Sequence, residues 1–362
     1  MAAPADNNIP HDIPDDVVFE ILTRTSLRTL DTCKCVAKTW KEDIIEDSIF
    51  LPTYCERTKN LSGFFLQDIR PLDYLSMFTS IDHSSPSDRI SCLPRDMKIL
   101  ASCNQGILCC IKRTCRQYRY YVCKPATEQW RSLPNPKLRH WTVGVAIRVF
   151  ESNPLRFKVI RISKKGFAKF SELYEYYCEI FDSNTWRWRE TETLFLPDEE
   201  FILDRVASIF VKCSYHWLTY DNNVVAFHDP TESFSTFHLP ELMSKGYRKY
   251  THKQLVDYQG RLGLSCMTDE STIELWLLET SNGIENEWKK HVVVDIGPVR
   301  EKVMWPNPAG FYNSGFILLQ GVYEVFIYKI KDGSLVRVKL KNGLSRGDEI
   351  YSFRSDLEMV NF

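Results

Sequence analysis

One phrase recurs through most of this chain: a short apolar strand, a polar turn, and then an aromatic or apolar residue. The residues that end the five copies are 56, 48, 54 and 47 positions apart, and they are Trp130, Trp186, Phe234, Trp288 and Leu335. A repeat of roughly 20–50 residues is typical of architectures in which each copy is one unit packed on its neighbours. The repeat therefore favours a fold built from a series of small sheets.

A second phrase, often containing glycine, precedes most copies, as in Gly106-Ile107-Leu108 and Gly260-Arg261-Leu262. The stretch that begins near Trp141 lacks a clear copy, although residues 157–162 alternate like a strand.

A period near 50 made of strands resembles the spacing of kelch-like β-propellers, and about 310 residues at about 50 per blade make about six blades. We predict a mainly β chain with a small α module and an irregular six-bladed propeller. Five or seven blades, a β-sandwich and a barrel are the alternatives. Residues 51–100 would form an atypical first blade with residues 63–66 as one strand.

The first fifty residues read as helices. Asp12 is placed to cap a helix whose first turn holds Pro14, Asp15 and Asp16, because acidic residues favour the positive end of the helix dipole. Apolar residues then recur at helical spacing in three short groups. These groups are Val17, Val18, Ile21 and Leu22; Leu30, Cys33, Ala37 and Trp40; and Ile44, Ile45 and Ile49. Three short helices bury little apolar surface, so we expect a leftover apolar face to dock on a neighbour.

The order and spacing of these residues resemble the F-box, whose usual form is Leu-Pro-x-x-Leu-x-x-x-Ile-Leu, a spaced Leu, and Val-Cys-Lys-x-Trp. The resemblance implies docking to the Skp-family adaptor, and through it to the cullin, of an SCF ubiquitin ligase. The family's contact positions carry over to Ile13, Pro14, Val17, Ile21, Leu22, Leu30, Val36 and Trp40. Thr25-Ser26 and Ala37 depart from the usual apolar residues and trim the adaptor-facing surface. The alternative is a helical hairpin that packs on the chain's own C-terminal domain.

The later motifs resemble the F-box-associated domain of the large plant F-box family. They are Gly-Ile-Leu-Cys at 106–109, Lys-Pro-x-Thr-x-x-Trp-x-x-Leu-Pro at 124–134 and Phe-Lys-Val-Ile-Arg at 157–161. Lys124 replaces the family's usual Asn. The two resemblances cover most of the chain and imply a flexible N-terminus at 1–8, an F-box at 9–50 and a propeller at 51–362.

Composition excludes several other classes. The net charge of −1 gives no sign of a nucleic-acid partner, although residues 1–50 carry −5 and the remainder +4. No apolar run is long enough to span a membrane, and the N-terminus does not resemble a signal peptide. We therefore expect a cytoplasmic or nuclear protein whose twelve cysteines are reduced, with no metal or other cofactor.

No phosphate-binding loop, zinc-protease motif or nucleophile elbow occurs, so the sequence gives no sign of catalysis by this chain. Together with this, the resemblance to F-box proteins implies a non-catalytic subunit that recruits protein clients. Arg139, His140 and Trp141 are the candidate client-binding residues, and Lys164-Lys165 is a second polar cluster. Solvated loops are the simpler interpretation of both. The rival function is a propeller that acts outside the ligase, either as an enzyme or by binding a glycan or small molecule at the mouth of its channel.

Overall fold

The computed structural model divides into two compact units between Asn60 and Leu61. In the first unit it describes residues 13–25, 29, 30, 33, 36, 37, 40, 50–58 and 60. In the second it describes residues 61–362 except 72, 82–92, 104, 114–117, 153, 166–172, 198–199, 204–205, 244–249, 269–270, 282–283, 313–314, 341–347 and 358. The predicted cap Asp12, the predicted helix around Ile44, Ile45 and Ile49, and Ser26 lie outside the described residues.

The first unit contains helices α1 (Asp15–Leu22) and α4 (Phe50–Thr58). Asp15 and Asp16 occupy the first turn of α1, as the sequence predicts, but Pro14 is the residue before the helix and not part of its first turn. Pro14 has an extended ψ of 143°, and no side chain caps this helix end by a hydrogen bond. The two acidic residues therefore stabilise the helix start through its dipole alone.

The core of the helical unit is formed by Val18, Leu22, Leu30, Phe50 and Tyr54. Phe50 is fully buried and meets the ring of Phe19 edge-on at 5.5 Å, while the hydroxyl of Tyr54 donates a hydrogen bond to the carbonyl of Thr25. Because α4 completes this core, the division between the units falls after α4 and not at the expected residue 50.

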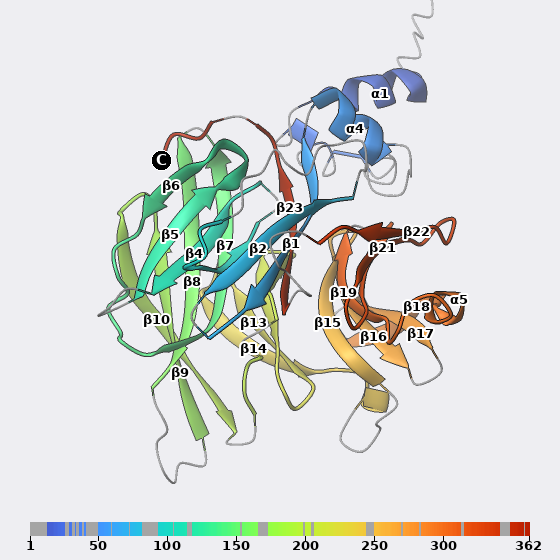
Figure 1. The fold of residues 1–362 in the computed structure, drawn as a ribbon. Coiled ribbons are helices and arrows are strands. Elements are labelled where there is room, and N and C mark those ends of the chain that lie inside the picture. Colours follow the sequence, from blue (N-terminus) through green and yellow to red (C-terminus); the bar gives the residue numbers. More distant parts are fainter. Residues whose placement is uncertain are drawn as a thin grey trace, which may run out of the picture. The chain divides into compact units, whose positions relative to one another are not determined.

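The second unit is a six-bladed β-propeller, which confirms the predicted fold (Figure 1). Within the described residues, five blades are four-stranded antiparallel meanders and the sixth has three strands. In chain order the four-stranded blades are β3 (Met97–Ser102), β4 (Leu108–Arg113), β5 (Tyr118–Lys124) and β6 (Gln129–Ser132); β7 (Trp141–Ser152), β8 (Leu155–Lys164), β9 (Leu173–Asp182) and β10 (Arg187–Pro197); β11 (Ile209–Val211), β12 (Ser214–Leu218), β13 (Asn223–His228) and β14 (Ser233–His238); β15 (Tyr250–Tyr258), β16 (Arg261–Thr268), β17 (Thr272–Ser281) and β18 (Ile284–Asp295); and β19 (Asn307–Tyr312), β20 (Phe316–Gln320), β21 (Val325–Lys329) and β22 (Leu335–Val338). Short helices η2 (Pro125–Thr127), η3 (Glu241–Met243) and α5 (Gly297–Arg300) lie in connections.

The repeats found in the sequence correspond to fixed places in the blades. Each of the five strand–turn–aromatic copies is the hairpin between the third and fourth strands of a four-stranded blade. The glycine-containing phrases lie at the start of second strands, as at Leu108, Arg261 and Phe316. Residues 157–162 form part of β8, which is the second strand of its blade.

The sixth blade joins the two ends of the propeller. It consists of β2 (Tyr74–Ser80), β1 (Leu61–Ile69) and the C-terminal β23 (Glu349–Ser355), with β1 in the middle. Strand β23 packs beside β19 and β3, which are the first strands of the two flanking blades, so it completes the inner ring. Residues 63–66 lie in β1 as predicted, and a Cβ at Gly63 would lie 1.9 Å from the carbonyl oxygen of Thr79. Glycine is therefore required at this close approach.

The hydrophobic cores lie between neighbouring blades. One cluster joins Val122 in β5 to Phe157 in β8, and another joins Ile180 in β9 to Trp217 in β12. Cys109, Cys110, Cys123, Cys178 and Cys266 are buried in such layers as unbridged thiols. Each blade therefore depends on both neighbours to cover its faces, as expected for a repeat architecture.

The closing blade generates the first prediction. Phe353 in β23 is fully buried and its ring lies 4.8 Å from that of Phe65 in β1. We expect Phe353→Ala to lower the free energy of unfolding by about 3–5 kcal/mol, because the change leaves a cavity in the closing contact. Met359→Ala, at a side chain that is 74% exposed, should change it by less than about 0.5 kcal/mol. Urea denaturation followed by circular dichroism measures both, and equal values would contradict the assignment of the closing role to β23.

Candidate functional site

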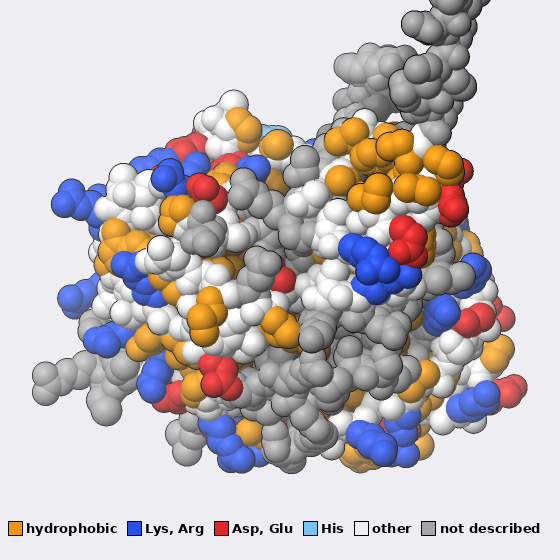
Figure 2. All heavy atoms as spheres, turned by 90° about the horizontal axis from the view of Figure 1, so that it is seen from above, with side chains coloured by type: hydrophobic (Ala, Val, Ile, Leu, Met, Phe, Trp, Pro, Cys, Tyr) orange, Lys and Arg blue, Asp and Glu red, His pale blue; other side chains and the backbone are white. Residues whose placement is uncertain are grey.

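An apolar stripe runs along the outer side of α1. Ile13, two residues before the helix, and Val17 and Ile21 within it are spaced by four residues and are 54%, 42% and 52% exposed. Val18 and Leu22, which each follow a residue of the stripe by one position, point into the helical core. Figure 2 shows hydrophobic side chains gathered over this unit, at the upper right of the view. A small unit that exposes an ordered apolar row in this way has a surface suited to another polypeptide.

The eight predicted adaptor-contact residues divide into two groups. Ile13, Pro14, Val17, Ile21 and Val36 are exposed, and Val36 is 65% exposed. Leu22 and Leu30 are 2% and 1% exposed in the unit's own core, and Trp40 packs partly buried against that core. The buried group shapes the helical unit, whereas only the exposed group is available for direct contact.

Polar contacts fix the C-terminal end of α1. Arg57 in α4 donates a hydrogen bond of 2.7 Å to Glu20 and one of 2.6 Å to the hydroxyl of Thr23. The hydrogen bond from Arg57 lowers the pKa of Glu20. Thr25, where the F-box pattern usually has an apolar residue, donates its hydroxyl to the carbonyl of Leu22 at 2.9 Å. Thr25 therefore stabilises the end of the helix. Arg57 lies beyond the predicted helical module, so sequence reasoning missed it.

Exposed apolar side chains are distributed unevenly over the propeller. Because the blade strands alternate in direction, the loops between second and third strands share one face with the segments that join successive blades; we call this the connection face. Most exposed large apolar residues of the described propeller lie there: Tyr118, Trp141, Leu173, Phe195, Phe201, Tyr220, Leu242, Val293, Met304, Trp305 and Tyr323. Phe150, Leu357 and Met359 lie at the opposite face, where β1 begins at Leu61 beside Ser355. The connection face therefore exposes more apolar surface for a binding partner than the opposite face does.

A buried ion pair holds one segment of the connection face in place. Arg161 in β8 and Glu179 in β9 are bonded to each other and are 3% and 0% exposed. Glu179 accepts hydrogen bonds from the backbone N–H groups of Lys137 and Leu138 at 2.8 and 3.1 Å. Arg161 donates to the carbonyl of His140 at 2.6 Å. These bonds pin residues 137–140, which connect the first two four-stranded blades.

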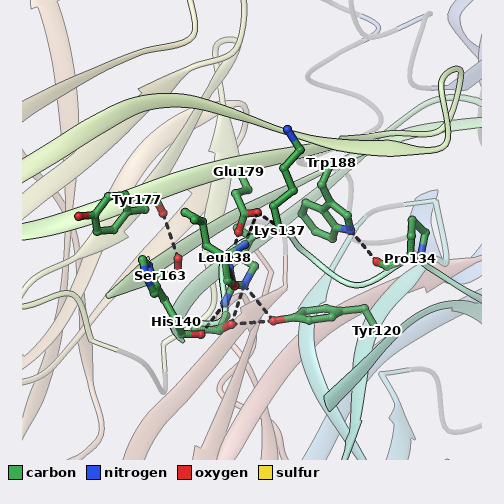
Figure 3. Close-up of polar contacts among 11 residues, drawn as sticks. Tyr120, Pro134, Lys137, Leu138, His140, Ser163, Tyr177, Glu179 and Trp188 are labelled. Carbon is green, nitrogen blue, oxygen red and sulfur yellow. Dashed lines mark hydrogen bonds and ion pairs between the residues drawn. The ribbon is translucent and has the colours of Figure 1, made fainter. Parts of the chain in front are cut away.

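Neighbouring groups satisfy the rest of the guanidinium. Arg161 Nε lies 2.8 Å from the hydroxyl of Thr142 and 3.0 Å from that of Tyr120, and these two hydroxyls are themselves hydrogen-bonded. Trp188 donates its indole N–H to the carbonyl of Pro134 at 2.7 Å, earlier in the same segment. Figure 3 shows Tyr120, Leu138 and His140 converging on the pair, while the Lys137 side chain extends away from it. Because nearly all of its hydrogen bonds are made, this buried pair holds the backbone of residues 137–140 in one conformation.

The predicted client-binding residues lie at the end of this pinned segment. Trp141 is 64% exposed at the start of β7, and Arg139 is exposed. The ring of His140 lies 4.7 Å from that of Tyr177. Burial, with smaller contributions from the cations Arg161 and Lys165, lowers the pKa of His140. The imidazole is therefore neutral at pH 7.

The structure also brings the second polar cluster to the same place. Trp141 is the direct cross-strand partner of Lys164, whose ammonium lies over the ring of Tyr174. Sequence reasoning treated Arg139–Trp141 and Lys164-Lys165 as separate clusters, and it missed Arg161 and Glu179. The sequence feature that could have revealed Arg161 and Glu179 is a charged residue inside each of two otherwise apolar strands. A charge at such a position requires a buried partner.

A pocket of about 60 Å³ lies beside Trp141, at the inner strands β3, β7 and β23. It is much smaller than the roughly 300–1,000 Å³ of typical small-molecule sites. Among the described residues, no group of three or more His, Cys, Asp or Glu side chains is arranged to hold a metal ion. No described helix has the length and apolar character needed to cross a membrane.

The matches to two family models agree with this architecture. Residues 63–352 match the model of the F-box associated beta propeller domain, and residues 10–42 match that of the F-box domain. The Arabidopsis thaliana protein At5g52610, whose name assigns it to the F-box proteins, is 26% identical over 92% of this chain and 92% of its own. F-box protein At5g41720 from the same plant is 31% identical over 41% of this chain and 84% of its own. The solved β-propeller domain of Cps50 (Swd1) from Myceliophteria thermophila aligns with 79% of this chain and 87% of its own, at 10% identity and a TM-score of 0.40.

The pinned segment generates the second prediction. Glu179→Ala leaves the Arg161 guanidinium buried without its carboxylate, so we expect the free energy of unfolding to fall by about 3–5 kcal/mol. Glu179→Gln keeps an acceptor and should cost less. In native-state hydrogen exchange, the amides of Lys137 and Leu138 should exchange faster in both variants. Unchanged exchange at these two amides would show that Glu179 does not hold the segment.

Proposed function

Because this chain belongs to the family of proteins with an F-box associated β-propeller domain, we propose that it is the substrate-recruiting subunit of an SCF-type ubiquitin ligase. In this role the helical unit docks on the Skp-family adaptor, and through it on the cullin, while the propeller binds a protein client. The chain itself contributes no catalytic residue. We place its action in the cytoplasm or the nucleus.

The exposed stripe on α1 is the observation that carries the adaptor part of the proposal. Val17 and Ile21 in α1, and Ile13 just before it, are about half exposed, while the other apolar side of the helix already fills a core. Keeping such side chains in water forgoes roughly 25 cal/mol for each Å² of apolar surface. A partner that covers the stripe recovers this free energy. The match of residues 10–42 to the F-box domain supports a Skp-family adaptor as this partner.

The client part of the proposal rests on the connection face. A propeller that concentrates its exposed aromatic and aliphatic side chains on one face offers one preferred docking surface. Phe201 and Tyr220, for example, stack in parallel at 4.8 Å on this face while remaining 43% and 66% exposed. Arg139, His140 and Trp141 contribute to the same face. A client held there acts as a tethered substrate, because tethering raises the effective concentration of its lysines near the conjugating enzyme.

The third prediction tests the adaptor surface. We expect the double variant Ile13→Asp, Ile21→Asp to lose co-purification with a Skp-family adaptor, because each new carboxylate would be buried unpaired in the interface. Thermal unfolding should be unchanged, since both side chains point away from the core. Leu22→Asp is unsuitable for this test, because it places a charge inside the helical core.

The matched control is Leu173→Asp with Val293→Asp. These aliphatic side chains are 49% and 55% exposed, close to the values for Ile21 and Ile13, but they belong to the propeller. The control should retain the adaptor. Adaptor binding that survives in the Ile13/Ile21 variant, or is lost equally in the control, argues against α1 as the docking surface.

The fourth prediction concerns the independence of the two surfaces. Affinity purification with mass spectrometry should show that the Ile13/Ile21 variant loses the adaptor and cullin but keeps the client set of the unaltered chain. Phe201→Asp with Tyr220→Asp should do the reverse, because these changes introduce charge into the connection face only. Loss of clients together with the adaptor in the first variant would contradict a separate client surface on the propeller.

A further inference from the structure

The chemistry around Trp141 indicates what kind of client segment this part of the connection face can hold. This inference rests on the proposed function. Trp141 presents a largely exposed indole at the end of the segment held by Arg161 and Glu179. Tryptophan and arginine are the residues that most often dominate the binding free energy of protein interfaces. An exposed indole with an arginine two residues away is therefore a candidate centre of an interface.

Positive charge predominates in the two segments that meet at Trp141 and its cross-strand partner Lys164. The side chains of Arg139 and Lys165 are exposed and form no ion pair with any described residue, and the same holds for Lys137. Lys164 lies over the ring of Tyr174. The exposed acids described nearby are Glu175, which accepts a hydrogen bond from the hydroxyl of Tyr177, and Glu190. Arg161 and Glu179 neutralise each other below the surface. The site therefore carries an excess of cations for a partner to neutralise.

The rigidity of the segment lowers the cost of binding. Ordering a mobile loop on association consumes part of the interaction free energy. Here the backbone of Lys137, Leu138 and His140 is already held by the buried pair, at distances between 2.6 and 3.1 Å. Burying an ion pair carries a desolvation cost, which is offset here by the hydrogen bonds that satisfy both groups. Most of its hydrogen bonds are made to residues 137–142, the stretch that leads to and includes Trp141.

We propose that Trp141, together with Arg139 and Lys165, binds an acidic segment of the protein client. An apolar side chain of the segment covers the indole, and neighbouring Asp or Glu carboxylates pair with the guanidinium and the ammonium. Charge complementarity of this kind sets the choice of partner and the rate of encounter, so binding weakens as salt screens it. Binding is non-covalent throughout.

A random peptide library tests the proposal on the full chain. We expect 12-residue peptides selected from a phage library to be enriched in Asp and Glu around one apolar residue. A synthetic version of the best peptide should bind at least about tenfold more weakly to the Arg139→Glu, Lys165→Glu variant. Trp141→Ala should weaken binding at least about fivefold, and 300 mM salt should weaken it for the unaltered chain. Fluorescence anisotropy measures the dissociation constants.

Two controls match the size and charge of these changes. Arg187→Glu with Lys302→Glu makes the same change in net charge at exposed positions elsewhere, and Phe150→Ala removes an aromatic side chain that is 43% exposed at the opposite face. Both should keep the dissociation constant within about twofold. Selected peptides without acidic enrichment, or equal weakening in the controls, would overturn the proposal. The two proposals can fail separately. A negative peptide result does not affect co-purification with the adaptor, and a negative adaptor result does not affect peptide binding.

Discussion

Pairing of β23 with β1 is the contact on which the rest of the propeller depends. It joins strands from the two ends of the unit, with Phe65 opposite Tyr351 and Gly63 opposite Phe353. The segment after β23 extends this closure, since Lys124 pairs with Asp356, and Gln129 exchanges two hydrogen bonds of 2.9 Å with the backbone of Val360. Because the cores lie between blades, an open ring would leave the two end blades with one face uncovered. The entropy lost when the two ends of the chain are joined is therefore offset by the packing that closure completes between the blades.

The closed ring is a rigid frame on which exposed groups can be positioned. Arg161 and Glu179 illustrate this, because two charges in a core are tolerated only when their hydrogen bonds are satisfied. The partners come from β5, β7 and the segment between two blades, so the network exists only when those blades are in register. Its consequence is a fixed position for Trp141 at the connection face. In the helical unit the same division recurs on a smaller scale, with Val18 and Leu22 inside and Val17 and Ile21 outside.

Local signals were sufficient to predict much of this protein. A hairpin between third and fourth strands needs only two short strands and a turn, so each copy was visible within about fifteen residues of sequence. The period predicted about six blades, with five and seven as alternatives, and the structure has six. The helical start at Asp15 and Asp16 was also a local signal. Arg139, His140 and Trp141 could be selected as a cluster, but nothing local distinguished them from a solvated loop.

The sequence by itself determined the repeat, a blade number near six and the apolar residues of the first helix, because these features depend on neighbours a few positions apart. Only the tertiary structure decided which side of α1 faces the core, that β23 completes the blade begun by β1, and that Lys164 lies beside Trp141. Each of these depends on contacts between segments far apart in the chain. Strand register and helix orientation are set by burial across the whole unit, and no local pattern contains that information.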